Sequence, residues 1–452
     1  MLSIAILVAL VAAIVFATAK LRINPFLALL AAALVGGFAF GLPVDTIAPT
    51  MTTAFGATLG NIGLIILFGT IIGVILERSG AAIAMAEALI KVLGTRFPTL
   101  TMSVIGFIVS IPVFCDSGFV ILNSLKKSLA ARSKVSLVAM TIALMTGLYS
   151  THVFVPPTPG PLAAAGNLNI IDQLGLIIGF GLIAAVVSAL AGLLWANRFL
   201  KKDIELMPEP AGEESEQDYE KIRAAYGKLP NAFLAFLPIL APILLICLAS
   251  IAKLPAAPFG DSGFFIAVVF LGTPVIALAV GLIASLFLLR GKGKLDAFGD
   301  RVTEGIRISA PILLITASGA AFGAVLAASD LTDFLGSSLS TLGLGLAVPF
   351  LISAALKTAQ GSSTVAMVTT SVLLLPLLPA LGLDSDLGKV LSVLAIGAGA
   401  MVISHANDSF FWVVSQLSRI PVATAYRTLT PATAIQGVAG FAAVWVIGLI
   451  VL

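Results

Sequence analysis

The feature that most constrains this chain is a succession of apolar runs, each about 20 residues long, from one end to the other. A helical run of this length matches the hydrocarbon core of a bilayer. Runs such as LSIAILVALVAAIVFATA do not alternate between polar and apolar residues, which excludes a transmembrane β-barrel. Only 10% of the residues are charged, against about 25% in soluble domains. The sequence therefore predicts an all-α polytopic membrane protein that has the lipid bilayer as a partner.

Charge and cysteine content exclude several further classes. The formal net charge is +3, and the Lys and Arg residues are scattered at the ends of apolar runs, so no basic patch favours nucleic acid as a partner. Cys115 and Cys247 both lie in apolar surroundings, which fits neither a disulfide framework nor a zinc site. We expect no cofactor and no metal.

The positions of Lys and Arg predict how the chain is oriented. Lys20 and Arg22 follow the first apolar run, residues 2–19, so we expect a retained helix that ends in the cytoplasm. Applied along the chain, the same rule places both termini in the periplasm. It places the Glu-rich segment 201–230 in the cytoplasm, as a linker that carries no chemistry. Further helices are predicted at about 23–42, 59–76, 135–150, 173–197, 232–252, 263–289 and 432–452, with another starting near 308 and a loop at 43–58.

The two halves of the chain repeat. Gly69, Gly73, Leu76 and Ser79 recur 250 positions later as Gly319, Gly323, Leu326 and Ser329. The two histidines, His152 and His405, follow Gly69 and Gly319 by 83 and 86 positions. Because the two halves enter the membrane from opposite sides, we expect an inverted-topology repeat with two re-entrant hairpins and two broken transmembrane helices. The predicted segments are scaffold helices at 1–58, a first repeat at 59–200 with a hairpin at 98–125 and a broken helix near 151–161, the linker, scaffold helices at 231–307, and a second repeat at 308–452 with a hairpin at 345–379 and a broken helix near 404–409.

Four interruptions at membrane depth predict one central site, since the freed backbone groups need a cavity and a ligand. The expected substrate-binding residues are Asp116, Ser117, Gly118, Thr151, His152, Thr158, Gln360, Gly361, Ser362, Ser363, Thr364, Ser404, His405, Asn407, Asp408 and Ser409. We expect no Lys or Arg side chain at these interruptions. We therefore expect helix N-termini, hydroxyls or a protonated histidine to hold a single carboxylate.

Four of these residues are predicted to carry a coupling proton: His152, His405, Asp408 and Asp116. Histidine is favoured because its ordinary pKa lies near neutrality. Each residue also has a simpler interpretation. The histidines would be hydrogen-bonded packing residues, and the aspartates would be helix N-caps.

The interruptions carry four motifs: FCDSGFVIL at 114–122, GLYSTHVFVPPTPGPLAAAGN at 147–167, KTAQGSSTVAMVTT at 357–370 and SHANDSFFWVVSQ at 404–416. Together they resemble the bacterial gluconate permease family, and the similarity extends over essentially the whole chain. The resemblance implies proton-coupled uptake of gluconate or a related small hydroxy acid across the bacterial inner membrane. It implies less directly a homodimer with a sliding transport domain. Relatives that carry D-serine leave the ligand open, and glycerate, 3-hydroxybutyrate and Na⁺ coupling are alternatives.

Two other function classes compete with a secondary active transporter. An intramembrane metal-dependent hydrolase would use the two histidines and two aspartates, but the chain has neither an H-E-x-x-H pair nor a G-x-S-x-G turn. A passive channel would lack uphill transport. We therefore predict a proton symporter for a small hydroxy monocarboxylate, and not an enzyme.

Overall fold

The computed structural model describes residues 2–21, 23–202, 204–208, 215–253, 259, 263–289, 293–329, 345–406 and 408–452. Within these ranges the chain forms helices and no strand. Six helical segments of the described chain are long and apolar enough to cross a membrane, and a seventh is added if one bent helix pair counts as a single span. The prediction of an all-α membrane protein is confirmed.

The helices of the first half are α1 (Leu2–Val15), α2 (Pro25–Ala39), α3 (Val44–Arg78), α4 (Ala81–Leu93), α5 (Pro98–Val109), α6 (Cys115–Ser133), α7 (Leu137–Phe154), α8 (Pro159–Asn167) and α9 (Leu174–Asn197). A π-helical turn at Phe16–Lys20 follows α1. Proline stands at the first helical position of α2, α5 and α8, where the missing amide hydrogen costs no intrahelical bond.

The linker contains α10 (Ser215–Ala225). The helices of the second half are α11 (Ala232–Ala252), α12 (Gly263–Leu271), α13 (Pro274–Ser285), α14 (Lys294–Ala327), α16 (Ala347–Gln360), α17 (Ser363–Leu374), α18 (Asp386–Gly399), α19 (Ser409–Leu417) and α20 (Val422–Val451).

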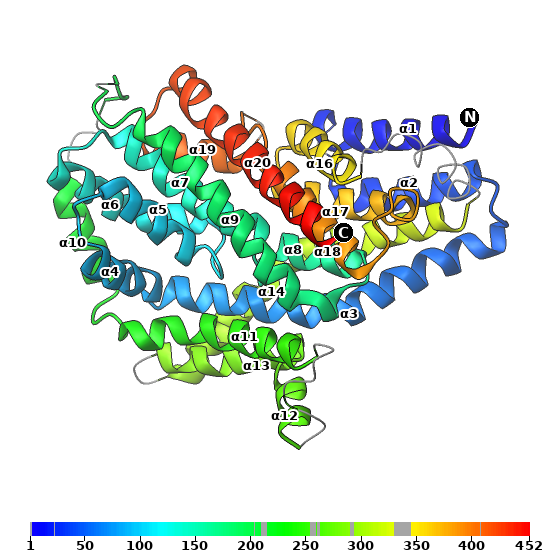
Figure 1. Ribbon diagram of the computed structural model, residues 1–452, viewed down its shortest axis with the longest axis horizontal. Coiled ribbons are helices and arrows are strands. Elements are labelled where there is room, and N and C mark those ends of the chain that lie inside the picture. Colours follow the sequence, from blue (N-terminus) through cyan, green and yellow to red (C-terminus); the bar gives the residue numbers. More distant parts are fainter. Residues whose placement is uncertain are drawn as a thin grey trace.

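The two longest helices, α3 and α14, pack against each other at the centre of the molecule (Figure 1). Each also contacts a helix of the other half, since α2 packs on α14 and α13 packs on α3. Helices α11 and α13 lie together along one side of α3 (Figure 1). On the opposite side, α9 packs on both α7 and α20. Among the interrupted helices, α8 contacts both α3 and α14, and α18 contacts both α9 and α20.

The predicted loop at 43–58 is wrong, because α3 is one continuous helix from Val44 to Arg78. The absence of Lys and Arg suggested an exit from the membrane, but the segment contains no residue that ends a helix. Pro49 lies near the start, where it removes only the bond to the Asp45 carbonyl. The Thr52 hydroxyl donates to the Ala48 carbonyl at 2.9 Å, so this polar side chain is satisfied within the helix.

Three other helix boundaries differ from the prediction. The segment 263–289 is not one helix, because Gly272 and Thr273 separate α12 from α13, and the pair bends by 71°. Pro274 starts the second part, as proline does at a first helical position. Helix α14 begins at Lys294 rather than near 308, and α20 begins at Val422 rather than 432. Both extensions are polar, so a search for apolar runs does not detect them.

The helices are interrupted at all four predicted places. The gaps fall at 110–114 between α5 and α6, at 155–158 between α7 and α8, at 361–362 between α16 and α17, and at 400–408 between α18 and α19. Helix α6 continues to Ser133, beyond the predicted end of the first hairpin at 125. His152 lies in the last turn of α7 rather than in the gap that follows it.

The linker helix α10 is docked on the body of the protein. The buried Tyr219 hydroxyl donates to the Glu87 carboxylate of α4 at 2.8 Å, and Arg223 pairs with the same carboxylate at 2.7 Å. Burial and the neighbouring Glu87 raise the pKa of the Tyr219 hydroxyl, so it stays a donor. Helix α10 also contacts α6. The linker helix therefore contacts α4 and α6, the two helices before and after α5.

Candidate functional site

A buried ion pair joins the two interrupted elements of the second half. Lys357 of α16 places its Nζ atom 2.6 Å from Oδ2 of Asp408, and the two side chains are only 1% and 5% exposed. Lys357 also donates to the carbonyl oxygen of Gly361, in the turn between α16 and α17. Asp408 accepts further hydrogen bonds from the Ser404 hydroxyl and from the backbone N–H of Phe410, at 3.0 Å for the latter. Every oxygen of this carboxylate is therefore occupied.

This pair corrects the expectation that no cation lies at the interruptions. Lys357 is three residues from Gln360, at the tip of the second hairpin, and it is fully buried. A second lysine, Lys126 of α6, is also fully buried and donates to the Ser418 hydroxyl at 2.6 Å. The statement that only helix ends, hydroxyls or histidine can hold a carboxylate is therefore wrong.

The first half contributes Asp116 and His152 to the same region. Asp116 lies in the first turn of α6 and interacts electrostatically with Asp408 and Lys357. His152 is buried and interacts with the same two groups. The four charged or titratable side chains come from α6, α7, α16 and the start of α19. The structure therefore brings residues of both halves to one place.

Several polar atoms at this place are buried and lack a hydrogen-bond partner among the described residues. They are Oδ1 of Asp116, Nδ1 of His152, and both amide atoms of Gln360. Such atoms are rare in folded proteins and are usually satisfied by a ligand or by water. Asp116 and His152 lie near the Lys357–Asp408 pair, and Gln360 follows Lys357 by three residues, so this region is the candidate binding site.

Of the two aspartates that could cap a helix, only one does so. Asp116 is not a cap, because the N-cap residue of α6 is Phe114, and no side chain caps this helix. The helix starts two residues earlier than the capping interpretation requires. Asp408 is the N-cap of α19, and it holds Lys357 at the same time. One aspartate therefore keeps a free carboxylate oxygen and the other does not.

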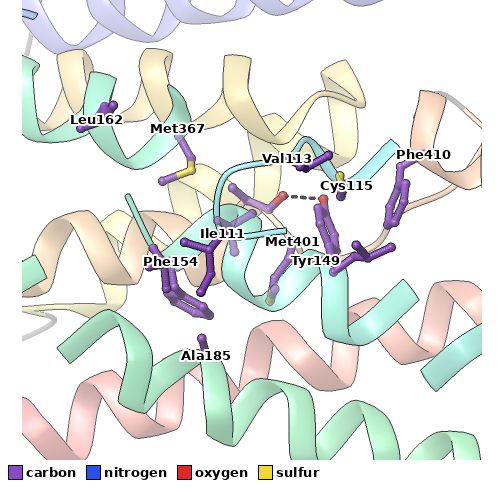
Figure 2. Packing of buried hydrophobic residues seen from close by; sticks show 14 of the residues in the cluster. Ile111, Val113, Cys115, Tyr149, Phe154, Leu162, Ala185, Met367, Met401 and Phe410 are labelled. Atoms are coloured by element: carbon purple, nitrogen blue, oxygen red, sulfur yellow. Dashed lines mark hydrogen bonds between the residues drawn. The ribbon is translucent and has the colours of Figure 1, made fainter. Parts of the chain in front are cut away.

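Aromatic side chains form one wall of the site. The Tyr149 hydroxyl donates to the Ala400 carbonyl in the second broken helix at 3.2 Å, and its ring lies 5.9 Å from Nζ of Lys357. The Tyr149 ring is 5.3 Å from that of Phe410 and stacks on His152 at 6.4 Å. Figure 2 shows Tyr149 and Phe410 gathered beside Cys115, at the start of α6. The wall therefore connects α7 to the end of α18 and to the start of α19.

Two glycines of α3 let the interrupted segments approach closely. A Cβ atom on Gly73 would lie 2.5 Å from the carbonyl oxygen of Pro112, in the gap between α5 and α6. A Cβ atom on Gly69 would lie 3.0 Å from the carbonyl oxygen of Pro157, in the gap between α7 and α8. The repeated glycine spacing in the first half thus positions both interruptions against one helix. In the second half, Gly319 and Gly323 both face Val372 of α17 instead.

Several other predicted residues lie at the site or at its edge. Ser363 and Ser409 are neighbours of Tyr149 and Asp116, respectively. Ser362 is the N-cap of α17, Gly361 has a positive φ of 83°, and Thr364 is in the first turn of α17. Gly118 packs closely on Leu148, since a Cβ atom there would meet that side chain at 2.7 Å. Ser117, on the same turn as Asp116, is a neighbour of Glu77.

Other predicted residues are engaged elsewhere or not described. The Thr151 hydroxyl donates to the Phe107 carbonyl of α5 at 2.8 Å, which is a packing contact. Thr158 donates to the Val155 carbonyl at 2.7 Å, within its own turn. His405 is partly buried, with Nε2 2.9 Å from the Thr358 carbonyl of α16. The Ser404 carbonyl accepts from Thr430 at 2.7 Å. Asn407 lies outside the described residues.

Sequence reasoning missed Lys357, although a signal was present. Lys357 is the only charged residue between Gly345 and Leu383, just as Asp116 is the only one between Pro98 and Leu125. The cost of a charge at membrane depth identified Asp116 and applies equally to Lys357. Tyr149 was also missed, and nothing in the apolar sequence of α7 singles it out.

The family model of the GntP permeases matches residues 1–450 of this chain. This chain belongs to the GntP permease family. The resemblance predicted from the four motifs is confirmed, and the protein is a permease rather than an enzyme. Across the described residues, no three His, Cys, Asp or Glu side chains are grouped so that they could hold a metal ion.

The relatives of this GntP-family permease are transporters of similar length. It is 31% identical to a gluconate permease of Pseudomonas aeruginosa, over 98% of this chain and 97% of that protein. It is also 31% identical to the D-serine transporter DsdX of Escherichia coli, over 97% of this chain and 96% of that protein. Among solved structures, MtrF of Neisseria gonorrhoeae superimposes with a TM-score of 0.67 at 15% identity, over 95% of this chain and 96% of that one. This last similarity shows a shared fold.

Proposed function

We propose that this permease takes up gluconate, or a closely related small hydroxy monocarboxylate, together with a proton. The membrane is proposed to be the bacterial inner membrane, with both termini in the periplasm and the linker in the cytoplasm. The observation that carries the proposal is the buried Lys357–Asp408 pair beside the unpartnered atoms of Asp116, His152 and Gln360. Lys357 would bind the carboxylate, and the neutral groups would bind hydroxyls.

The charges at the site favour coupling to a proton. Two carboxylates, Asp116 and Asp408, face one ammonium, Lys357. A bound monocarboxylate adds a further negative charge in a region where an uncompensated charge is costly. If Asp408 takes a proton as the substrate arrives, the total charge stays constant and Lys357 is released to the substrate. Proton and substrate then stabilise each other's binding.

The sequence alone favours a histidine as the proton carrier, and the contacts favour Asp408. Within the described part of the chain, no hydrogen bond or ion pair joins His152 to a carboxylate, and its Nδ1 atom has no hydrogen-bond partner. Asp408 accepts a hydrogen bond from Lys357, the cation that is proposed to bind the substrate carboxylate. A proton on Asp408 therefore changes the site directly. His152, His405 and Asp116 remain candidates for passing the proton to or from it.

Neutral polar groups at the site suit a hydroxylated ligand. Gln360 offers two donors and one acceptor oxygen, and His152 offers a ring nitrogen. Gly361 and Ser362 leave the N-terminus of α17 pointing out of the hairpin turn, where backbone N–H groups favour an anion. This set of groups fits gluconate, glycerate and 3-hydroxybutyrate alike.

D-Serine is the second candidate substrate, and one observation favours it. The relative DsdX is named as a D-serine transporter. An amino acid also carries an ammonium group, and Oδ1 of Asp116 is a buried carboxylate oxygen without a partner. An ammonium there would satisfy Asp116 while Lys357 binds the carboxylate. A hydroxy acid without an amino group would instead require Asp116 to be protonated or hydrated.

We further propose that segments 59–200 and 308–452 are inverted repeats, with 1–58 and 231–307 as scaffold helices. Support comes from the exchange of neighbours, in which α2 packs on α14 and α13 packs on α3. The pairs α5–α7 and α16–α18, which occupy corresponding places in the two segments, are each in contact. The homodimer implied by the family resemblance remains a prediction.

The test is uptake by proteoliposomes that contain only the purified protein. An inward proton gradient should drive the accumulation of labelled gluconate above equilibrium, and a proton ionophore should abolish it. A Na⁺ gradient without a proton gradient should not replace it. Downhill flux without accumulation would indicate a channel. Accumulation of D-serine in preference to gluconate would change the substrate but not the coupling.

A further inference from the structure

A polar cavity lies away from the candidate site, between the α3–α14 pair and the helices α8 and α17. Its volume is about 170 Å³. Its polar lining consists of Thr58, Asn61, Asn167 and Asn169, and the rest consists of small or apolar residues of α3, α8, α14, α17 and the turn after α17. No charged side chain lines it. A cavity of this volume has room for several water molecules.

Contacts along α3 separate this cavity from the interruption between α7 and α8. Gly69 meets Pro157, inside the gap before α8, whereas Ile62 meets Gly166 at the other end of α8. Thr58 lies a further turn along α3. With a rise of 1.5 Å per residue, Thr58 is about 16 Å from Gly69. The cavity is therefore a separate location, on the side that the Lys and Arg pattern assigns to the periplasm.

One buried group in the cavity lacks a partner. Asn167 is 6% exposed, and its Nδ2 atom donates to the Ser371 hydroxyl at 2.9 Å and to the Val368 carbonyl at 3.3 Å. These bonds fix the carboxamide against α17. Its Oδ1 atom is buried and has no hydrogen-bond partner among the described residues. A buried amide oxygen in a polar cavity is an acceptor that a hydroxyl group of a ligand or a water molecule would satisfy.

We propose that this cavity is an outer binding site for the hydroxylated part of the substrate, which the substrate occupies before it reaches the candidate site. The lining offers amide and hydroxyl groups without a cation, so it suits hydroxyls and not a carboxylate. The same cavity should therefore accept an uncharged polyol. The identity of the natural ligand rests on the proposed function, but the polyol prediction does not.

The experiment measures how much labelled gluconate the purified protein binds at saturation, with and without excess sorbitol. We expect two gluconate molecules per chain, of which sorbitol displaces one. The double variant Thr58→Val/Asn61→Leu removes polar groups at similar volume, so it should bind one molecule that sorbitol does not displace. Thr53→Val is the matched control, since Thr53 is an exposed threonine of α3 outside the lining, and it should bind two.

The outcomes separate this inference from the proposed function. Lys357→Met should raise the Kd only of the gluconate that sorbitol does not displace. If the wild-type protein binds one gluconate that sorbitol leaves in place, the cavity holds water only and the inference is overturned, whereas the proposed function stands. If a sorbitol-sensitive molecule depends on Thr58 and Asn61 but Lys357→Met changes nothing, the outer site stands and the proposed substrate site fails. The wild-type measurement with sorbitol needs no variant and decides the matter even if the double variant misfolds.

Discussion

Lys357→Met and Asp408→Asn should have opposite effects on gluconate binding, although the two residues form one ion pair. Lys357 is expected to contact the substrate carboxylate, and a hydrogen bond to a charged group contributes about 1.5–3 kcal/mol. At about 1.4 kcal/mol per tenfold change, Lys357→Met should raise the Kd by about 10- to 100-fold. Asp408 competes with the substrate for the same ammonium, so Asp408→Asn should leave the affinity unchanged or increase it.

The pH dependence sharpens this prediction. In the wild-type protein, protonation of Asp408 frees Lys357, so gluconate should bind more tightly as the pH falls. Asparagine resembles the protonated acid at every pH, so Asp408→Asn should bind gluconate with an affinity that no longer depends on pH. The same variant should equilibrate gluconate across the membrane but no longer accumulate it against a gradient, because the coupling proton has no acceptor.

The assay is equilibrium binding of labelled gluconate to purified protein at acidic and alkaline pH, followed by uptake in proteoliposomes. Removing one partner of a buried ion pair costs about 3–5 kcal/mol, because the other charge is left uncompensated. Lys357→Met is therefore compared with Lys357→Met/Asp408→Asn, in which neither charge remains. The double variant should recover thermal stability and still bind weakly. If Asp408→Asn weakens binding as much as Lys357→Met does, Asp408 is a ligand-contacting residue and the competition mechanism is refuted.

Three further predictions concern packing, the histidines and orientation. Gly73→Ala places a Cβ atom 2.5 Å from a carbonyl oxygen, so it should cost about 1–3 kcal/mol and lower the melting temperature, whereas Gly56→Ala, with open space around it, should not; equal melting temperatures would contradict the close approach. His152→Gln should weaken gluconate binding about fivefold through one lost hydrogen bond and keep proton-driven uptake; loss of accumulation with normal binding would make His152 the proton carrier instead. A cysteine introduced at Lys201 should be shielded from a membrane-impermeant thiol reagent in intact cells and react after the membrane is opened; labelling in intact cells would reverse the proposed topology.

Local sequence signals were sufficient to predict where the helices are interrupted. The run of prolines from Pro156 to Pro161 cannot continue a helix, and Gly361 takes a backbone conformation that favours glycine. Apolar runs also located most helices. They failed at the polar starts of α14 and α20 and at 43–58, because a helix can form without an apolar run of residues.

The contact between Lys357 and Asp408 could not be predicted from local signals. The two residues are 51 positions apart, on elements that α17 and α18 separate in the sequence. The unpartnered state of Asp116 Oδ1 is likewise a tertiary property. The sequence suggested a helix cap there, and only the position of the α6 start shows that the carboxylate is not used for capping.

The two hairpins carry opposite charges, and this asymmetry bears on the mechanism. Each predicted hairpin contains one charged side chain near its tip, Asp116 in the first and Lys357 in the second. Two identical repeats would place like charges at the centre, which would repel each other and favour either anions or cations alone. With one acid and one ammonium, the site attracts a carboxylate through Lys357 and retains an acidic group that can hold a proton or an ammonium. Exchange of the two charges, in Asp116→Lys/Lys357→Asp, should therefore not restore gluconate binding, because Asp408 would then face an aspartate at position 357.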